Sequence, residues 1–282
     1  MRSRTTTGDG RPGRTSVHPL ITKLGLDGDP KLLHERRGTT FFKVGDTALK
    51  ITDGLMAGRE GEVLAALGAD HYTAHGRYGP GTWLVMRWIN GTSLWDALEP
   101  AHRGDDTPAT RRSILTAAAE AAEALADLHA AGWTHGDLQP DHVVFEDDVV
   151  RIIDLACAQG PVPVPFYVHR GGLAHTTAPE IATLILNTTD HITATPEADV
   201  WSLAASLFWS WTRTPPTDYR DPDGGRSKLL ADIAACRPRE LAAVRPRPFP
   251  PFEGAVLAGL THDPERRLSA ADLARSFRSA NP

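Results

Sequence analysis

The sequence predicts an α+β fold in two lobes, a small strand-rich lobe followed by a larger, mainly helical one. Short strand patterns come first, within residues 31–86, and helical spacing of apolar residues prevails later, mostly from residue 180 onward. The 282 residues are enough for two cores. Strands that precede helices along a chain are typical of α+β proteins. We therefore expect a flexible arm at 1–30, a first lobe at 31–86 and a second lobe at 87–280.

The first lobe begins with a predicted hairpin. The segment "TTFFKVGDTALKIT" contains two strand patterns joined at Gly45-Asp46, a dipeptide that favours a tight turn. The segment "AGREGEVLAAL" follows, and the spacing of Val63, Leu64 and Leu67 predicts a helix. The apolar run "TWLVMRWI" is typical of a buried strand.

The second lobe begins with a long predicted helix. Thr107 is a good N-cap residue and Pro108 suits the first turn. The helix is expected to run to about His129, because one apolar stripe recurs at helical spacing through Ile114, Ala118, Ala121, Leu125 and Leu128. The segment "VVFEDDVVRII" then predicts a second hairpin. The later part is mostly helical, including "DVWSLAASLFWSW", and a proline-rich linker, "RPRPFPP", precedes the last helical segment.

Composition and charge exclude several classes of protein. The net charge of −5 gives no reason to expect nucleic-acid binding. Two cysteines argue against a disulfide scaffold and suit a reducing cytoplasm. No apolar run approaches the length of a membrane span, and the N-terminus lacks the apolar core of a secretory signal. We expect a cytoplasmic protein with no membrane partner.

Two aspartates lie at the ends of the second predicted hairpin. Asp137 is in the loop "HGDLQPDH" before it, and Asp154 follows its second strand. A hairpin folds back on itself, so its two ends are close in space. Two carboxylates facing one site suit a divalent metal and a base that acts on a hydroxyl group. The alternative is that both aspartates cap turns.

A lysine lies among apolar residues of the first hairpin. Lys50 is flanked by Leu49 and Ile51, and a charge in that setting is costly unless it is paired or at a sheet edge. Glu60, near the start of the next predicted helix, is the expected partner. The alternative is an edge-strand lysine and a solvated glutamate. Together with the two aspartates, the pair forms a pattern suited to phosphate and metal.

Seven short motifs follow one another in an order that resembles the protein-kinase-like superfamily. They are "ALKI" with Lys50, "REGEVL" with Glu60, "HGDL" with Asp137, "IIDLA" with Asp154, "APE" at 178–180, "DVWSL" from Asp199 and "DPERRLSAADL" with Arg267. The resemblance extends over residues 40–275. It implies a bilobal protein-kinase-like fold, with a small β-rich N-lobe and a larger helical C-lobe that form one domain overall.

The resemblance also implies roles in phosphate transfer for four charged residues of these motifs. Lys50 would bind the phosphates of ATP, and Glu60 would hold Lys50 in place. Asp137 would be the catalytic base that accepts the proton of the substrate hydroxyl, and Asp154 would bind Mg²⁺. ATP and Mg²⁺ are therefore the expected cofactors.

Further residues are assigned by the same resemblance. Asp199 would hold the catalytic loop through backbone N–H groups, and Arg267 would pair with Glu180 of "APE". The adenine is expected to meet the backbone of a hinge next to a gatekeeper side chain. These hinge residues are Met86 as the gatekeeper, Arg87, Trp88 and Ile89.

The phosphate-covering loop departs from the family pattern. No Gly-x-Gly-x-x-Gly precedes Lys50, and the segment offers only Gly38, Thr39 and Thr40. Their backbone N–H groups and hydroxyls are the candidates for covering the phosphates, as in small-molecule kinases that lack the full motif. An ordinary hairpin tip is the alternative interpretation.

The catalytic loop departs as well. Gly136 stands where many protein kinases carry arginine, which leaves no obvious partner for a phosphorylated activation segment. "HGDL" is also typical of aminoglycoside and choline kinases, and Gln139 replaces the lysine common in Ser/Thr kinases. Leu155-Ala156 follows Asp154 in place of Phe-Gly.

His142 stands where the family has a metal-binding asparagine. Mg²⁺ prefers oxygen ligands and imidazole suits softer ions. Three interpretations follow. The neighbouring Asp141 supplies the second metal contact, or His142 binds Mn²⁺ or a metal-bound water, or the second metal site is degraded.

These observations predict a bacterial Ser/Thr-kinase-like phosphotransferase. The "APE" motif, the "DVWSL" segment and the terminal arginine favour a peptide or protein acceptor, including a biosynthetic precursor peptide. One alternative is a small-molecule kinase of the aminoglycoside or choline type, for which Asp141, Glu146, Asp147 and Asp148 could line an acidic acceptor pocket. The other alternative is a pseudokinase that serves as a peptide-binding scaffold.

Overall fold

The computed structural model describes residues 17–280 and divides the chain into two compact units. Of the described residues, the first unit comprises 17–61 together with Asp70–Trp88, and the second comprises Glu62–Ala69 and residues 89–280. The unit boundary thus follows Trp88, close to the expected lobe boundary at 86. Residues 62–69 belong to the helical unit, because helix α2 (Met56–Leu67) crosses from one unit to the other.

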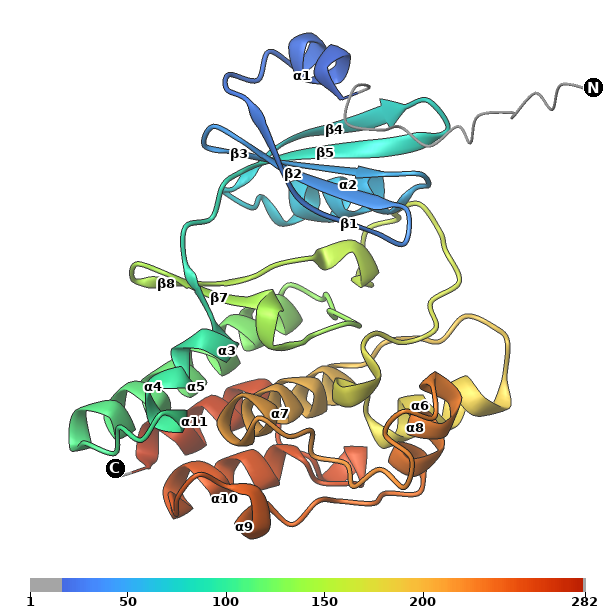
Figure 1. Ribbon diagram of the computed structural model, residues 1–282. Coiled ribbons are helices and arrows are strands. Elements are labelled where there is room, and N and C mark those ends of the chain that lie inside the picture. Colours follow the sequence, from blue (N-terminus) through green and yellow to red (C-terminus); the bar gives the residue numbers. More distant parts are fainter. Residues whose placement is uncertain (1–16, 281–282) are drawn as a thin grey trace, which may run out of the picture. The chain divides into compact units, whose positions relative to one another are not determined.

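The first unit is built on a five-stranded antiparallel sheet in the order β1-β2-β3-β5-β4 (Figure 1). Its strands are β1 (Pro30–Arg36), β2 (Thr39–Val44), β3 (Thr47–Thr52), β4 (Tyr72–Tyr78) and β5 (Gly81–Arg87). The predicted hairpin of β2 and β3 is confirmed, with Val44 opposite Thr47 across Gly45-Asp46. Gly45 has a positive φ of 55°, and a Cβ there would lie 2.6 Å from the carbonyl oxygen of Asp27, which explains the glycine.

Helix α1 (His18–Leu24) packs on one face of this sheet. Val17, Leu20 and Ile21 are buried there in a cluster completed by sheet residues, which are Phe42, Val44, Leu49, Ile51 and Val85. The expected flexible arm at 1–30 is therefore wrong for residues 17–30, because three apolar residues at helical spacing bury themselves on the sheet. Residues 1–16 lie outside the described part of the chain.

The second unit is mainly helical. Its helices are α3 (Leu94–Ala97), α4 (Glu99–His102), α5 (Pro108–Ala130), α6 (Pro179–Asn187), α7 (Pro196–Thr212), α8 (Arg226–Ala234), α9 (Leu241–Val244), α10 (Pro250–Gly259) and α11 (Ala270–Ser279). A small antiparallel sheet contains β6 (Thr92–Ser93), β7 (Val143–Glu146) and β8 (Val149–Ile152). Short 3₁₀ turns are η2 (Pro140–His142), η3 (Leu155–Cys157), η4 (Ala174–Thr176) and η5 (Pro264–Arg266).

The predicted long helix and second hairpin are confirmed. Helix α5 starts after Thr107, whose hydroxyl accepts the N–H of Thr110, and Pro108 occupies its first turn. Strands β7 and β8 pair from Val143–Ile152 to Glu146–Val149. Val143 and Ile152 pair at one end of this hairpin. The loop that contains Asp137 precedes Val143, and Asp154 follows Ile152 by two residues.

Helix α7 forms the centre of the second unit. It packs against α3, α5 and α10, as its position among the helices in Figure 1 shows. Most of its side chains are buried, including Trp201, Phe208 and Trp211. Trp211 contacts the rings of Phe249 and Phe252. A helix buried on most sides gives the nearby loops a rigid base. Among residues 17–280, no helix is both long and apolar enough to cross a lipid bilayer.

Candidate functional site

The first unit contains the predicted lysine–glutamate pair. Lys50 lies on β3 between Leu49 and Ile51, which face α1, so the alternation of a strand turns its side chain to the opposite face. Glu60 of α2 meets it there, and Lys50 Nζ lies 2.6 Å from Glu60 Oε2. The two side chains are 12% and 3% exposed. A buried carboxylate that hydrogen-bonds an ammonium fixes the direction of the lysine side chain.

The residues predicted to cover the phosphates lie at the tip of the β1–β2 hairpin and at the start of β2. Arg37 and Gly38 have φ values of 50° and 75°, the left-handed conformation of a two-residue hairpin turn. The φ of Gly38 favours glycine at this position, because other residues rarely adopt it without strain. Thr39 and Thr40 are the first residues of β2. Both interpretations of this segment, phosphate cover and ordinary hairpin tip, remain predictions.

Of the predicted hinge residues, Met86 and Arg87 are the last two of strand β5, and Trp88 and Ile89 follow it. Met86 is buried. The N–H of Arg87 donates to the carbonyl of His71 at 2.8 Å, and the N–H of Trp88 donates to the carbonyl of Asp46 at 2.7 Å. Two of the expected backbone donors are thus used within the first unit. Ile89 is the first hinge residue of the second unit, so the assignment of these residues to adenine stays a prediction.

In the second unit, Asp137 is enclosed by its own loop and by the segment before α6. Its Oδ1 accepts the N–H of Leu173 at 2.8 Å, and its backbone N–H donates to Nδ1 of His135 at 3.1 Å. Burial raises the pKa of the Asp137 carboxyl, and the hydrogen bond from Leu173 opposes that rise. A buried carboxyl with a raised pKa is suited to taking up a proton near neutral pH.

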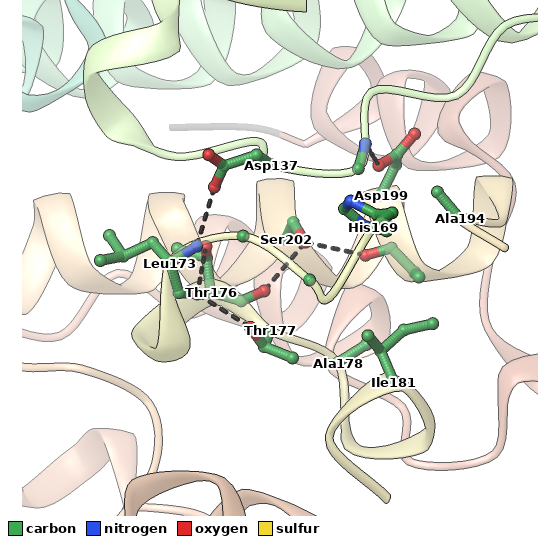
Figure 2. Close-up of a pocket in the computed structure, with 14 residues that line it drawn as sticks. Asp137, His169, Leu173, Thr176, Thr177, Ala178, Ile181, Ala194, Asp199 and Ser202 are labelled. Carbon is green, nitrogen blue, oxygen red and sulfur yellow. Dashed lines mark hydrogen bonds between the residues drawn. The ribbon is translucent and has the colours of Figure 1, made fainter. Parts of the chain in front are cut away.

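A small cavity of about 20 Å³ lies beside Asp137. Figure 2 shows Asp137 above the segment from Leu173 to Thr177, with Asp199 and His169 alongside. This volume holds roughly one water molecule. On this side of Asp137, the neighbouring residues leave room for only about one water molecule.

His142 lies between the two aspartates. Its Nδ1 is 2.9 Å from the carbonyl oxygen of Asp137, and its Nε2 is 3.5 Å from Oδ2 of Asp154. A carbonyl oxygen only accepts, so Nδ1 carries a proton. The lone pair of Nε2 in the neutral ring then faces the Asp154 carboxylate. This arrangement suits a cation between the two groups, either a proton or a metal ion.

Asp154 has an unusual backbone conformation. Its φ and ψ are 59° and 56°, in the left-handed region that aspartate tolerates better than most residues. It immediately precedes η3, and its side chain is 40% exposed. Left-handed non-glycine residues tend to occur where a side chain must be aimed in a particular direction.

The predicted metal residues are only partly brought together. Among residues 17–280, no three or more His, Cys, Asp or Glu side chains are grouped to hold a metal ion. Asp154 and His142 form a two-residue donor set, whereas Asp141 is exposed. One carboxylate oxygen and one imidazole nitrogen fit a divalent ion that takes its remaining ligands from phosphate and water. The pair therefore fits such an ion, while the assignment of each residue stays a prediction.

The catalytic loop is fixed from α7. Asp199 accepts the backbone N–H groups of His135 at 2.6 Å and Gly136 at 2.9 Å, as the sequence predicts for this aspartate. Nε2 of His129 lies 3.2 Å from Oδ2 of Asp199. His135 in turn donates from Nε2 to the carbonyl of Ile153 at 3.0 Å. These contacts tie the loop around Asp137 to the residue before Asp154.

The predicted pairing of Arg267 with Glu180 is confirmed. The two guanidinium donors lie 2.7 and 3.1 Å from the two carboxylate oxygens of Glu180. The side chain of Arg267 is fully buried, and it also donates to the carbonyl oxygens of Glu197, Thr261 and His262. The planar guanidinium group, with its five N–H donors, can hydrogen-bond all of these acceptors at once, which a lysine ammonium cannot do.

Comparison with known families covers most of the chain. A family model described as "Protein kinase domain" matches residues 74–276, well over half of the 282 residues. The chain belongs to the protein kinase family. Its sheet-rich first unit and helical second unit are the bilobal α+β fold that the sequence predicts.

Individual protein kinases are similar to this one. It is 26% identical to the serine/threonine-protein kinase PAK 4 of Homo sapiens over 193 residues, which cover 68% of this chain and 30% of that protein. It is 32% identical to the serine/threonine-protein kinase PknD of Mycobacterium tuberculosis over 225 residues, which cover 77% and 31%. It is 28% identical to the serine/threonine-protein kinase AfsK of Streptomyces coelicolor over 151 residues, which cover 50% and 16%. The chain thus spans less than a third of each of these relatives.

His169 is a further residue at this site that the motifs did not reveal. His169 is buried, its Nδ1 lies 2.7 Å from the hydroxyl of Tyr167, and its Cε1 lies 3.3 Å from where a Cβ of Gly136 would be. His169 therefore occupies space beside the catalytic loop that a larger residue at 136 would need. The glycine in "HGDL" was the available signal. Nothing in the sequence indicated which residue would fill that space.

Proposed function

We propose that this chain is an ATP-dependent phosphotransferase that moves the γ-phosphate to a Ser or Thr hydroxyl of a peptide or protein. The observation that carries the proposal is the enclosed carboxylate of Asp137, held by Leu173 in a chain of the protein kinase family. The named relatives are serine/threonine-protein kinases, which supports a protein acceptor. The likeness of "HGDL" to aminoglycoside and choline kinases stays a prediction.

Asp137 is the proposed catalytic base. Its Oδ1 is engaged by Leu173, so we assign Oδ2 to the substrate hydroxyl. That oxygen takes the hydroxyl proton as the hydroxyl oxygen bonds to the γ-phosphorus. The bond from the γ-phosphorus to the bridging oxygen breaks, and ADP leaves with the electron pair. The raised pKa of the Asp137 carboxyl makes it a better proton acceptor than a solvated aspartate.

Lys50 and Glu60 are proposed to serve the nucleotide. The ammonium of Lys50 would neutralise phosphate charge, and the buried carboxylate of Glu60 keeps that ammonium oriented. Phosphoryl transfer depends mainly on such positioning and charge neutralisation. The backbone and hydroxyl groups of Gly38, Thr39 and Thr40 are the proposed phosphate cover, and the hinge from Met86 to Ile89 is the proposed adenine contact.

Asp154 and His142 are proposed to hold a divalent ion. When bound, such an ion neutralises charge on the phosphate oxygens. Nδ1 of His142 donates to the carbonyl of Asp137, which orients the ring so that Nε2 faces Asp154. Mg²⁺ is the ion expected of the family, and Mn²⁺ is the alternative that an imidazole ligand favours.

The test is phosphate transfer from labelled ATP to candidate peptides, with Mg²⁺ or Mn²⁺. Asp137→Asn should reduce the rate by about 100-fold or more, since general base catalysis contributes 10²–10⁴-fold. Asp127→Asn, on the exposed side of α5, is the matched control and should leave the rate unchanged. Unchanged transfer by Asp137→Asn would contradict the assignment of the base. A biosynthetic precursor peptide is the finer proposal for the acceptor, and amino alcohols in the same screen test the small-molecule alternative.

The pseudokinase alternative has one observation in its favour. A protonated His142 would form an ion pair with Asp154 and occupy the carboxylate that a metal needs. A thermal-shift titration with ATP, with and without each metal, separates the alternatives. A ligand at 100 times its Kd stabilises the fold by about 2.7 kcal/mol. No shift with any metal would favour the scaffold.

A further inference from the structure

The backbone between Arg170 and Leu173 fits closely around the carboxylate of Asp137. Leu173 donates its N–H to Oδ1 at 2.8 Å, as the dashed line in Figure 2 shows. A Cβ at Gly172 would lie 2.0 Å from the same oxygen and 2.7 Å from Cα of Asp137. No side chain fits at that separation. The position of the proposed base therefore depends on the path of this segment.

Arg226 hydrogen-bonds the backbone of this segment. It is the first residue of α8, and its guanidinium donates from Nη1 to the carbonyl of Gly172 at 2.7 Å and from Nη2 to the carbonyl of Arg170 at 2.9 Å. The two acceptors flank Gly171, whose φ of 68° turns the chain between them. A rigid fork of two donors suits two carbonyls held in fixed positions, whereas an ammonium is a single point of contact.

The same segment is anchored on its other side by Arg170. Its guanidinium donates to the carbonyl of Ile185 at 2.6 Å and to the carbonyl of Asp190 at 3.0 Å. Ile185 lies in α6, and its Cδ1 is 2.7 Å from where a Cβ of Gly171 would be. Two arginines thus hold the turn, one from α8 and one through α6 and the loop after it. Of the two, Arg226 hydrogen-bonds the carbonyl of Gly172, the residue next to Leu173.

We propose that Arg226 is a positioning residue for Asp137. It holds the carbonyls of Arg170 and Gly172, which places the N–H of Leu173 on Oδ1 and leaves Oδ2 for the acceptor. It is assigned no contact with the substrate. The inference rests on the proposed function of Asp137 as the base, and it adds a residue that no motif of the sequence identified.

The test compares Arg226→Ala and Arg226→Lys with Lys228→Ala. Lys228 lies on the same helix and pairs with Asp221 at 2.7 Å, so its removal changes the local charge without touching the segment. The turnover number and the KM for ATP are measured for each variant. Hydrogen exchange at the Leu173 amide is measured in parallel, and this readout needs no activity.

Arg226→Ala should lower the turnover number by about tenfold or more, because a small misplacement of a catalytic group can cost up to 100-fold. The KM for ATP should change by less than about twofold, since no nucleotide contact is assigned to Arg226. Exchange at Leu173 should quicken by about tenfold, as expected when a hydrogen bond to a charged group is lost. Arg226→Lys should fail to restore turnover, and Lys228→Ala should match wild type.

Three outcomes would overturn the inference. These are turnover within about twofold of wild type in Arg226→Ala, an equal loss in Lys228→Ala, or unchanged exchange at Leu173. If Arg226→Ala does not fold, Arg226→Lys carries the test, since an ammonium cannot donate to both carbonyls in the geometry of the guanidinium. A wild-type protein that transfers phosphate to no acceptor would contradict the proposed function, and the exchange at Leu173 would still decide whether Arg226 anchors the turn.

Discussion

Asp199 fixes the backbone of His135, whose N–H lies 2.6 Å from Oδ2 of this buried carboxylate. The other oxygen accepts the N–H of Gly136 at 2.9 Å. Two adjacent residues of a loop are thereby bound to one side chain of α7. The loop that holds Asp137 consequently depends on a residue far along the sequence.

We expect Asp199→Asn to destabilise the protein. The amide oxygen can accept only one of the two backbone N–H groups. The other N–H would face the NH₂ group of the asparagine, and these two donors would lack an acceptor. The loss should be about 1.5–3 kcal/mol, the range for a hydrogen bond to a charged group. Urea unfolding measures it, with Asp127→Asn on the exposed side of α5 as the control. Equal stability of the two variants would contradict the role of Asp199.

Lys50 and Glu60 allow stability to be separated from activity. Lys50→Met removes the ammonium that Glu60 hydrogen-bonds in a buried setting. Loss of one partner of a buried ion pair costs about 3–5 kcal/mol. The double variant Lys50→Met/Glu60→Gln should recover part of that stability, because no buried carboxylate remains, yet it should stay inactive.

Denaturant unfolding and phosphate transfer, measured on the same samples, check this pair. An additive loss of stability in the double variant would show that the two residues are not coupled. Transfer by the double variant at the wild-type rate would contradict the role of Lys50 toward the nucleotide.

The sequence predicted the elements that carry strong local signals. The helix from Pro108 has an N-cap, a first-turn proline and a regular apolar stripe, and the β2–β3 hairpin has a glycine at its turn. Strands β1 and β4 were missed, because "PKLLHER" and "YTAHGRY" contain too many polar residues for a clear alternation. Their pairing with β2 and β5 stabilises them, and such tertiary support leaves little trace in the local sequence.

The residues of the candidate site also fall into those that the sequence predicted and those that it did not. Side chains with defined chemistry, such as Lys50, Glu60 and Asp137, stand out in motifs, and so did the pairing of Arg267 with Glu180. The N–H of Leu173 could not be predicted, because any residue other than proline supplies an N–H. Arg226 was equally hidden, since it acts on backbone carbonyls that carry no side-chain signature.

Stability should fall in mild acid because of His135. Burial lowers the pKa of this imidazole from its ordinary 6.5, and the neighbouring His142 adds to the effect. The folded state therefore binds fewer protons than the unfolded state. The neutral ring contributes its full stability above about pH 6.5, and this contribution is lost as pH falls below that value toward the folded pKa. Protonation would also remove the acceptor for the N–H of Asp137.

Urea midpoints measured between about pH 7.5 and 5 test this expectation. His135→Asn retains an acceptor near Nδ1 without a titrating ring, so its midpoint should change less over this range than that of wild type. Parallel curves for the two proteins would show that His135 does not contribute to the acid sensitivity.

His142 should determine the metal preference. Its Nδ1 proton is committed to the carbonyl of Asp137, so Nε2 can present a lone pair beside Asp154. We therefore expect His142→Asn to shift the ratio of Mn²⁺ to Mg²⁺ affinity toward Mg²⁺ by about tenfold relative to wild type, the lower end of the effects seen when a group that orients a metal site is changed. Thermal shifts with each metal and ATP, together with transfer rates, measure the ratio.

Asp141→Asn tests the other candidate ligand, and it should leave the ratio unchanged because its side chain is exposed. An identical ratio in wild type and His142→Asn would remove His142 from the metal site, and a change in Asp141→Asn alone would assign the second contact to Asp141.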